Sequence, residues 1–147
     1  MPRVTLEEQN KYEFKFKTTI QTRDLNYANH LGNDALVSLL QESRVALFKK
    51  LGFKELDLGD GRTGIIIGDL LINFKAEGFL FDELSIEDHI GDITEKSFRI
   101  YSRVVATKNN TVLALAETGV VAFDYKARKI TTIPEAFRQA LEKLKSK

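Results

Sequence analysis

The stretch NDALVSLLQESRVALFKKL, from Asn33 to Leu51, decides the fold of this chain. Its apolar residues recur with the spacing of an α-helix and form one wide face. That face consists of Leu36, Leu39, Leu40, Ser43, Leu47 and Leu51. Val37, Val45 and Phe48 fall on the otherwise polar side, so we expect other elements to cover the helix on more than one face. The sequence therefore predicts a long, largely buried helix over residues 33–51.

The segment that leads into this helix, TRDLNYANHLGN from Thr22 to Asn33, is rich in polar side chains. Such residues collect at helix starts because they cap free backbone N–H groups. Asn33 or Asp34 suits the N-cap, and Gly52 suits the left-handed residue after the last turn. The first turn of a helix also has N–H groups without intrahelical partners and a partial positive charge. The segment is therefore both a helix start and a candidate site for a developing negative charge.

The segments around the helix have the composition and spacing of β-strands. Residues 11–22 alternate between apolar and polar side chains, which is typical of a half-buried strand. Later strands are predicted in GIIIGDLLINFKA (64–76), DELSIEDHIGDI (82–93), KSFRIYSRVVAT (96–107) and TVLALAETGVVAFD (111–124). Pro134 opens a closing amphipathic helix. This order predicts one α+β domain over residues 1–147, in which an antiparallel sheet wraps around the central helix. Because such a sheet covers its helix incompletely, we expect self-association.

Composition narrows the class of function. The chain has 147 residues, a formal net charge of +1 and no cysteine. The balanced charge gives no reason to expect nucleic acid or a membrane as partner. The absence of cysteine excludes disulfides and a cysteine nucleophile, and two distant histidines give little support to a metal site. With no signal-peptide pattern and no apolar run long enough to cross a bilayer, we expect a cytoplasmic protein.

Taken together, these segments resemble the hotdog-fold thioesterases, specifically the branch of 4-hydroxybenzoyl-CoA thioesterase and the small bacterial acyl-CoA thioesterases. The family motif reads Asp-x-Asp-x-x-Gly-His-Val-Asn-Asn, followed by an apolar helix with Glu-x-x-Arg or Glu-x-Arg and then Leu-Gly. The matching segments are DLNYANHLGN (24–33), LLQESRVALFKKLG (39–52) and TTIPEAFRQALEKL (131–144). The resemblance implies a hotdog fold, hydrolysis of an acyl-CoA or acyl-carrier-protein thioester without a cofactor, and a homodimer or homotetramer.

One departure from the family motif concerns the chemistry. The second acid of the motif is the family's catalytic carboxylate, and Asn26 stands there in this chain. An amide can hold a water molecule or an acyl carbonyl, but it cannot take up a proton near neutral pH. The base would then be Asp24, His30 or Glu42, among which a histidine ordinarily titrates closest to neutral pH. The resemblance assigns the backbone N–H of Asn33 as the donor to the oxyanion.

Further residues are candidates for holding the two ends of the substrate. An apolar tunnel for the acyl chain could be lined by Val37, Phe48, Phe74, Phe79 and Phe81. Phosphates of CoA could meet Lys75, Arg99, Arg103, Lys126 and Arg128. The alternative for the first set is ordinary core, and for the second an ordinary charged surface.

Two other functions remain compatible with the sequence. Hydratases and dehydratases of the same fold use a loop histidine and a helix acid, parts that His30 and Glu42 could play, although their Pro/Gly-rich loop is missing here. The second alternative is a thioester-binding protein in which Asn26 marks lost catalysis. A thiol-release assay separates hydrolysis from both alternatives.

Overall fold

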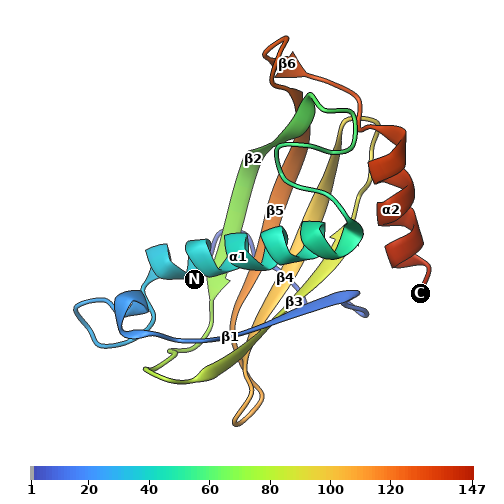
Figure 1. Cartoon of the computed structure of the whole chain (residues 1–147). Helices are drawn as coiled ribbons and strands as arrows, with labels where there is room; N and C mark the ends of the chain where they lie inside the picture. The colour runs from blue at the N-terminus through green and yellow to red at the C-terminus, as the bar shows by residue number, and fades with distance from the viewer. Residues whose placement is uncertain (1) are drawn as a thin grey trace.

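The structure, a computed structural model, describes residues 2–147 (Figure 1). The elements in chain order are β1 (Phe14–Thr19), a short 3₁₀ turn (Thr22–Asp24), α1 (Asn33–Leu51), β2 (Thr63–Phe74), β3 (Glu83–Gly91), β4 (Ser97–Ala106), β5 (Thr111–Asp124), β6 (Lys129–Ile130) and α2 (Glu135–Lys145). The α+β class, the antiparallel sheet, the long helix and the closing helix predicted from the sequence are all confirmed. No helix within residues 2–147 combines the length and the apolar character needed to cross a bilayer.

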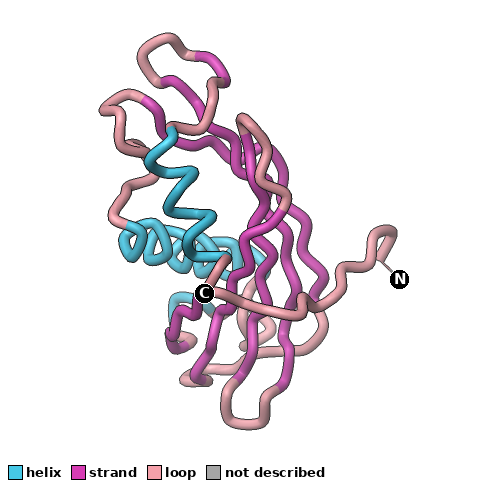
Figure 2. The backbone as a smooth tube through the Cα atoms, turned by 90° about the vertical axis from the view of Figure 1, so that its right-hand side faces the viewer, coloured by secondary structure: helices cyan, strands magenta, loops and turns pink. Residues whose placement is uncertain are grey.

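The strands form one antiparallel sheet in the order β1-β3-β4-β5-β2, and β6 adds a short pairing to β5. Helix α1 lies across one face of this sheet, and α2 packs near its C-terminal end (Figure 1). Figure 2 shows both helices on the same side of the sheet and the N-terminus on the opposite side. Strand β2 lies at the end of the sheet order, and no further strand of the described chain pairs with its outer edge. The loop after α1 covers only the start of this edge, where the N–H of Ile65 donates to the carbonyl of Glu55 at 2.8 Å.

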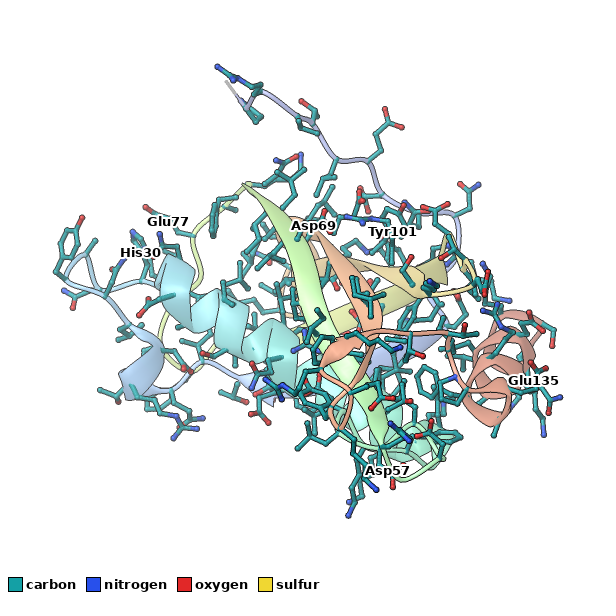
Figure 3. All side chains as sticks on the ribbon, turned by 90° about the horizontal axis from the view of Figure 1, so that it is seen from above. His30, Asp57, Asp69, Glu77, Tyr101 and Glu135 are labelled. Atoms are coloured by element: carbon teal, nitrogen blue, oxygen red, sulfur yellow. The ribbon has the colours of Figure 1, made fainter. Side chains whose placement is uncertain are left out.

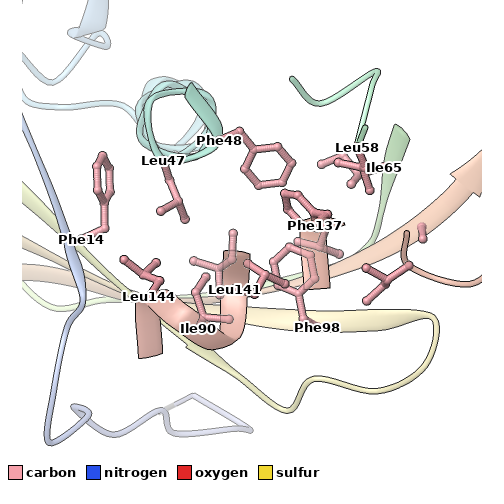
Figure 4. Packing of buried hydrophobic residues seen from close by; sticks show 14 residues of the cluster. Phe14, Leu47, Phe48, Leu58, Ile65, Ile90, Phe98, Phe137, Leu141 and Leu144 are labelled. Carbon is pink, nitrogen blue, oxygen red and sulfur yellow. The ribbon is translucent and has the colours of Figure 1, made fainter. Parts of the chain in front are cut away.

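Two clusters of buried side chains join the helices to the sheet. The cluster at the C-terminal end of α1 is aromatic, because Phe48, Phe98 and Phe137 meet there with ring centroids 5.1–6.4 Å apart (Figure 4). Phe137 comes from α2, so the closing helix fills this end of the core. The second cluster lies under the N-terminal half of α1 and is aliphatic, with Leu36 and Leu113 among its members. The aromatic side chains therefore close one end of α1, and smaller ones surround the other.

The observed bounds of α1 agree with the prediction, but its N-terminal cap does not. Gly32 is the N-cap, with φ −74° and ψ 152°, and it contributes no side-chain cap. The expectation of Asn33 or Asp34 as N-cap is therefore wrong, because both residues already lie inside the first turn. At the other end, Gly52 adopts the predicted left-handed conformation with φ 90°.

The predicted coverage of α1 on more than one face is only partly present. Phe48 is fully buried, whereas Val37 and Val45 remain 41% and 43% exposed. These two valines lie two helical turns apart on the same side of the helix. The chain therefore leaves an apolar stripe of α1 open.

A buried polar cluster lies between α1 and the sheet. The carboxylate of Asp88 on β3 accepts hydrogen bonds from the hydroxyls of Ser43 on α1, at 2.7 Å, and Ser102 on β4, at 2.6 Å. Burial raises the pKa of the Asp88 carboxyl above its usual range, and the two hydrogen bonds and the nearby Arg44 charge oppose that rise. Buried polar groups need hydrogen-bond partners, and here the partners come from both the helix and the sheet. The cluster therefore fixes the position of α1 along the sheet.

We predict that Asp88→Asn changes the pH dependence of stability. Because the pKa of Asp88 is raised in the folded protein, the folded state keeps a proton on this carboxyl at pH values where the unfolded chain has released it. The contribution of Asp88 to stability is therefore lost as the pH rises through the pKa of the folded state. The asparagine has no proton to lose, and its amide can pair with both serines. The free energy of unfolding of wild type minus that of the variant should therefore fall with rising pH in urea titrations. A difference that does not change with pH would contradict this reading.

Candidate active site

A cavity of about 860 Å³ lies at the N-terminal end of α1, and we call it the α1 cavity. One wall comes from the loop between Asn26 and Asp34, and the opposite wall comes from residues 74–78, which are the last residue of β2 and the segment after it. Leu36 and Leu113 complete the lining. The cavity therefore opens where the polar loop predicted from the sequence meets the start of the apolar helix.

Backbone hydrogen bonds give the polar loop its shape. The N–H of Asn26 donates to the carbonyl of His30 at 3.0 Å, and the N–H of Asn29 donates to the carbonyl of Asn26 at 3.0 Å. Asn29 has φ 61°, a left-handed conformation that asparagine tolerates better than most residues. The Oδ1 atom of Asn26 accepts the N–H of Ala28 at 2.9 Å. The Asn26 carboxamide oxygen is thus used in the turn, while its Nδ2 donors have no acceptor within residues 2–147.

A close contact ties the two walls of the cavity together. The N–H of Leu31 donates to the carbonyl of Gly78 at 2.8 Å. A β-carbon at Gly78 would lie 2.8 Å from side-chain atoms of both Ile20 and Leu113, so a larger residue cannot fit without a shift. Glycine at this position therefore allows the segment after β2 to approach the loop, and it fixes the position of the neighbouring Glu77.

The start of α1 presents free backbone donors to the cavity. Asn33 is the first helical residue and lines the cavity, and its backbone N–H has no acceptor among the described residues. Its side-chain Oδ1 accepts the N–H of Asp34 at 2.8 Å. Because Gly32 contributes no side chain, nothing from the N-cap covers the first turn. The helix therefore directs an unsatisfied N–H and the positive end of its dipole toward the cavity lining.

His30 and Glu77 face each other across the cavity. The Nδ1 atom of His30 lies 3.2 Å from the carbonyl oxygen of Leu31, and Nε2 lies 3.8 Å from Oε1 of Glu77. Figure 3 shows these two side chains on neighbouring loops at the end of the helix. Glu77 was not among the residues predicted from sequence, because an isolated glutamate after a strand carries no local pattern. The one sequence feature that marks this position is the neighbouring Gly78, but the close approach of Gly78 to the loop is seen only in the structure.

Of the five predicted catalytic residues, the structure brings Asn26, His30 and Asn33 together in the cavity lining. Asp24 does not line it. That side chain is almost buried, and its Oδ2 accepts the N–H of Gln21 at 2.8 Å, which caps the 3₁₀ turn.

Glu42 also lies outside the α1 cavity. It is exposed on α1, more than two turns beyond the first helical residue. Glu42 forms no ion pair within the described chain, and the guanidinium of nearby Arg44 pairs instead with Glu55 at 2.5 Å.

Most of the residues predicted to line an acyl tunnel or to bind CoA phosphates lie outside the α1 cavity. Among the five tunnel candidates, Phe74 lines the α1 cavity, whereas Phe48 belongs to the aromatic core and the other three are exposed outside it. Among the five basic candidates, Lys75 lines the cavity. Arg99 and Arg103 instead form ion pairs with carboxylates on or beside the sheet. The sequence could not separate these groups because strand alternation does not say which face a ligand uses.

The remaining histidine, His89, has a structural partner outside the α1 cavity. His89 on β3 lies 2.8 Å from Oε2 of Glu13, through its Nδ1 atom. Within residues 2–147 no group of three or more Asp, Glu or His side chains has the arrangement of metal ligands.

Comparisons with known proteins point to one family and one fold. The sequence matches the family model described as the thioesterase-like superfamily over residues 20–141. No curated protein matches it significantly. A solved 1,4-dihydroxy-2-naphthoyl-CoA thioesterase from Synechocystis has a TM-score of 0.80 at 16% identity, and the match covers 87% of this chain and 94% of that one.

Two further solved structures agree. A gentisyl-coenzyme A thioesterase has a TM-score of 0.77 at 20% identity, over 87% of this chain and 99% of its own. A Staphylococcus aureus protein in complex with CoA has a TM-score of 0.82 at 12% identity, over 97% of this chain and 89% of its own. At these identities the likeness shows the shared fold.

Proposed function

We propose that this chain, which belongs to the thioesterase-like superfamily and is a thioester hydrolase with the hotdog fold, acts on acyl-CoA thioesters and binds them in the α1 cavity. The observation that carries this assignment is the free N–H of Asn33, which lies in the lining of a cavity that also holds His30. A preorganised donor of this kind lowers the barrier to acyl transfer by about 3–4 kcal/mol.

In the proposed reaction, the thioester carbonyl accepts hydrogen bonds from the N–H of Asn33 and from Nδ2 of Asn26. Nε2 of His30 takes a proton from a water molecule, and the water oxygen attacks the carbonyl carbon. The carbonyl electrons move to oxygen, and the resulting oxyanion is held by the same two donors. When the carbonyl re-forms, the carbon–sulfur bond breaks and His30 returns its proton to the leaving thiolate. The products are the free acid and the thiol.

The cavity suits a molecule with an apolar acyl part and an anionic handle. Its volume falls within the range of small-molecule sites, about 300–1,000 Å³. Phe74, Leu36 and Leu113 supply apolar contacts, and Lys75 supplies a positive charge. Two of the similar structures are thioesterases of aromatic acyl-CoAs, and a third was solved with CoA, which favours CoA over a carrier protein as the thiol.

We further propose that the functional unit contains a second copy of this chain, in a homodimer or homotetramer. Beyond Ile65, whose N–H donates to the carbonyl of Glu55, the outer edge of β2 pairs with no strand of the described chain, and its exposed apolar residues include Ile67 and Leu70. Unpaired edges of this kind readily accept another strand. The open stripe of Val37 and Val45 on α1 would be covered by the same partner. If the cavity of such a partner lay beside Glu42, which is exposed on α1, the Glu42 carboxylate could act there as a base.

The experiment is a thiol-release assay with a panel of aromatic and aliphatic acyl-CoAs. We expect wild type to release CoA from at least one of them, with a rate well above background. Asn26→Asp serves as the comparison, because an aspartate can still accept the N–H of Ala28 and keep the turn. An inert wild type that gains hydrolysis in Asn26→Asp would instead support the non-catalytic alternative. Turnover of an enoyl-CoA without thiol release would support the hydratase alternative.

A further inference from the structure

The structure assigns Glu77 as the positioning residue for His30, an inference that rests on the proposed function of the α1 cavity. The carboxylate of Glu77 holds the attacking water beside Nε2 of His30, and it then holds the imidazolium that forms when His30 takes the proton. Nothing in the family motif places a carboxylate at this position of the chain.

The first step of the argument is the tautomer of His30. Nδ1 lies 3.2 Å from the carbonyl oxygen of Leu31, and a carbonyl oxygen can only accept a hydrogen bond. Nδ1 must therefore carry the proton in the neutral ring. The lone pair of the neutral imidazole is then on Nε2, the atom that faces Glu77. This is the state of the ring that a general base needs.

The second step is the separation between the two groups. Nε2 and Oε1 lie 3.8 Å apart, and both are acceptors when His30 is neutral and Glu77 is ionised. Two acceptors at this distance do not bond to each other, but a water molecule can donate one O–H to each at ordinary hydrogen-bond lengths. The pair thus orients a water with a proton directed at the base. After proton transfer, Nε2–H becomes a donor and can bond to the carboxylate.

The third step is the fixed position of Glu77. The carbonyl of the next residue, Gly78, accepts the N–H of Leu31, so the backbone around Glu77 is joined to the backbone around His30. The Glu77 side chain itself is 63% exposed, so its charge is partly screened by solvent. We therefore attribute its effect mainly to the geometry of the water and only secondarily to long-range attraction.

The fourth step is the replacement at Asn26. The family motif has its catalytic carboxylate at this position, on the same loop as His30. In this chain the side chain there is an amide, which cannot act as a base. Glu77 supplies a carboxylate to the same cavity from the opposite wall. The other charged groups that line the cavity are Asp34 and Lys75, and neither forms an ion pair with His30 in the described chain. The cavity therefore has a carboxylate next to His30 although position 26 carries an amide.

The kinetic test is a double-mutant cycle on kcat/KM with the best acyl-CoA. We expect Glu77→Gln to lower kcat/KM about tenfold to a hundredfold, mostly through kcat. In a His30→Gln background the same change should have almost no effect, because Glu77 acts through His30. Glu83→Gln, which removes an exposed carboxylate outside the α1 cavity, is the matched control. Equal losses from Glu77→Gln in both backgrounds, or a loss confined to KM, would overturn the assignment.

A second measurement is independent of activity. With only two histidines in the chain, ring-nitrogen NMR of histidine-labelled protein resolves His30 and His89. Glu77→Gln should move the Nε2 resonance of His30, while His89, which pairs with Glu13, stays in place as an internal reference. A shifted His30 signal in a protein that hydrolyses no thioester would refute the proposed function but not the pairing. An unmoved signal in an active enzyme would refute the pairing alone.

Discussion

Asn33→Pro is expected to lower kcat for thioester hydrolysis by about 10²–10³-fold while the protein stays folded. The substitution removes one atom group of the proposed mechanism, the backbone N–H at the first helical position. Proline is favoured there, because that N–H has no intrahelical partner and the ring fixes a helical φ. Gly32, with φ −74° and ψ 152°, already has the extended conformation that a residue before proline requires.

Asn33→Ala is the matched control for this prediction. Both variants lose the side-chain Oδ1 that accepts the N–H of Asp34, but the alanine keeps its own backbone N–H. We therefore expect Asn33→Ala to retain activity within a few-fold, with a melting temperature similar to that of the proline variant. The measurement is kcat with saturating acyl-CoA, together with circular dichroism of both proteins. If the two variants lose activity to the same degree, the donor to the oxyanion is not this amide.

The sequence predicted the elements of this fold well because each has a strong local signal. The helical spacing of leucines placed α1 at its observed bounds. The strand-favouring composition of residues 96–107 placed β4, whose observed burial alternates along its whole length. The N-cap was harder to predict because Asn33, Asp34 and Gly32 are all acceptable cap residues. The choice among them depends on where the preceding loop approaches the helix. That approach is set by the hydrogen bond between the N–H of Gly32 and the carbonyl of Asp24, which no local pattern reports.

Some residues of the candidate site could be predicted from local sequence, and others could not. Asn26, His30 and Asn33 could be grouped from sequence because one short loop carries all three. Glu77 could not, because it reaches the cavity through the contact between Leu31 and Gly78, which joins two segments far apart along the chain. Asp24 has the right chemistry for a base, but its carboxylate caps a turn outside the cavity lining. Local sequence thus identifies which residues are capable of chemistry, and tertiary packing decides which of them meet.

His30→Ala is expected to lower kcat/KM by about 10²–10⁴-fold, the range that a general base contributes. Replacing the carboxylate of either other candidate by an amide should have a much milder effect. Asp24→Asn keeps an acceptor for the N–H of Gln21, and Glu42→Gln keeps the shape of an exposed side chain. We expect both variants to stay within a few-fold of wild type if each cavity works with its own loop residues.

The pattern of the three variants separates the possible bases. A large loss in Glu42→Gln that is restored by mixing it with His30→Ala subunits would mean that Glu42 serves the partner's cavity. A large loss in Asp24→Asn with unchanged thermal stability would mean that the loop rearranges when substrate binds, because the Asp24 carboxylate is held by Gln21 in this structure. If His30→Ala hydrolyses the substrate as fast as wild type, another group must activate the water. The contact between His30 and the carbonyl of Leu31 would then serve only the packing of the loop. The three rates therefore test the same physical requirement, that one group in reach of the carbonyl must accept a proton while the helix holds the oxyanion.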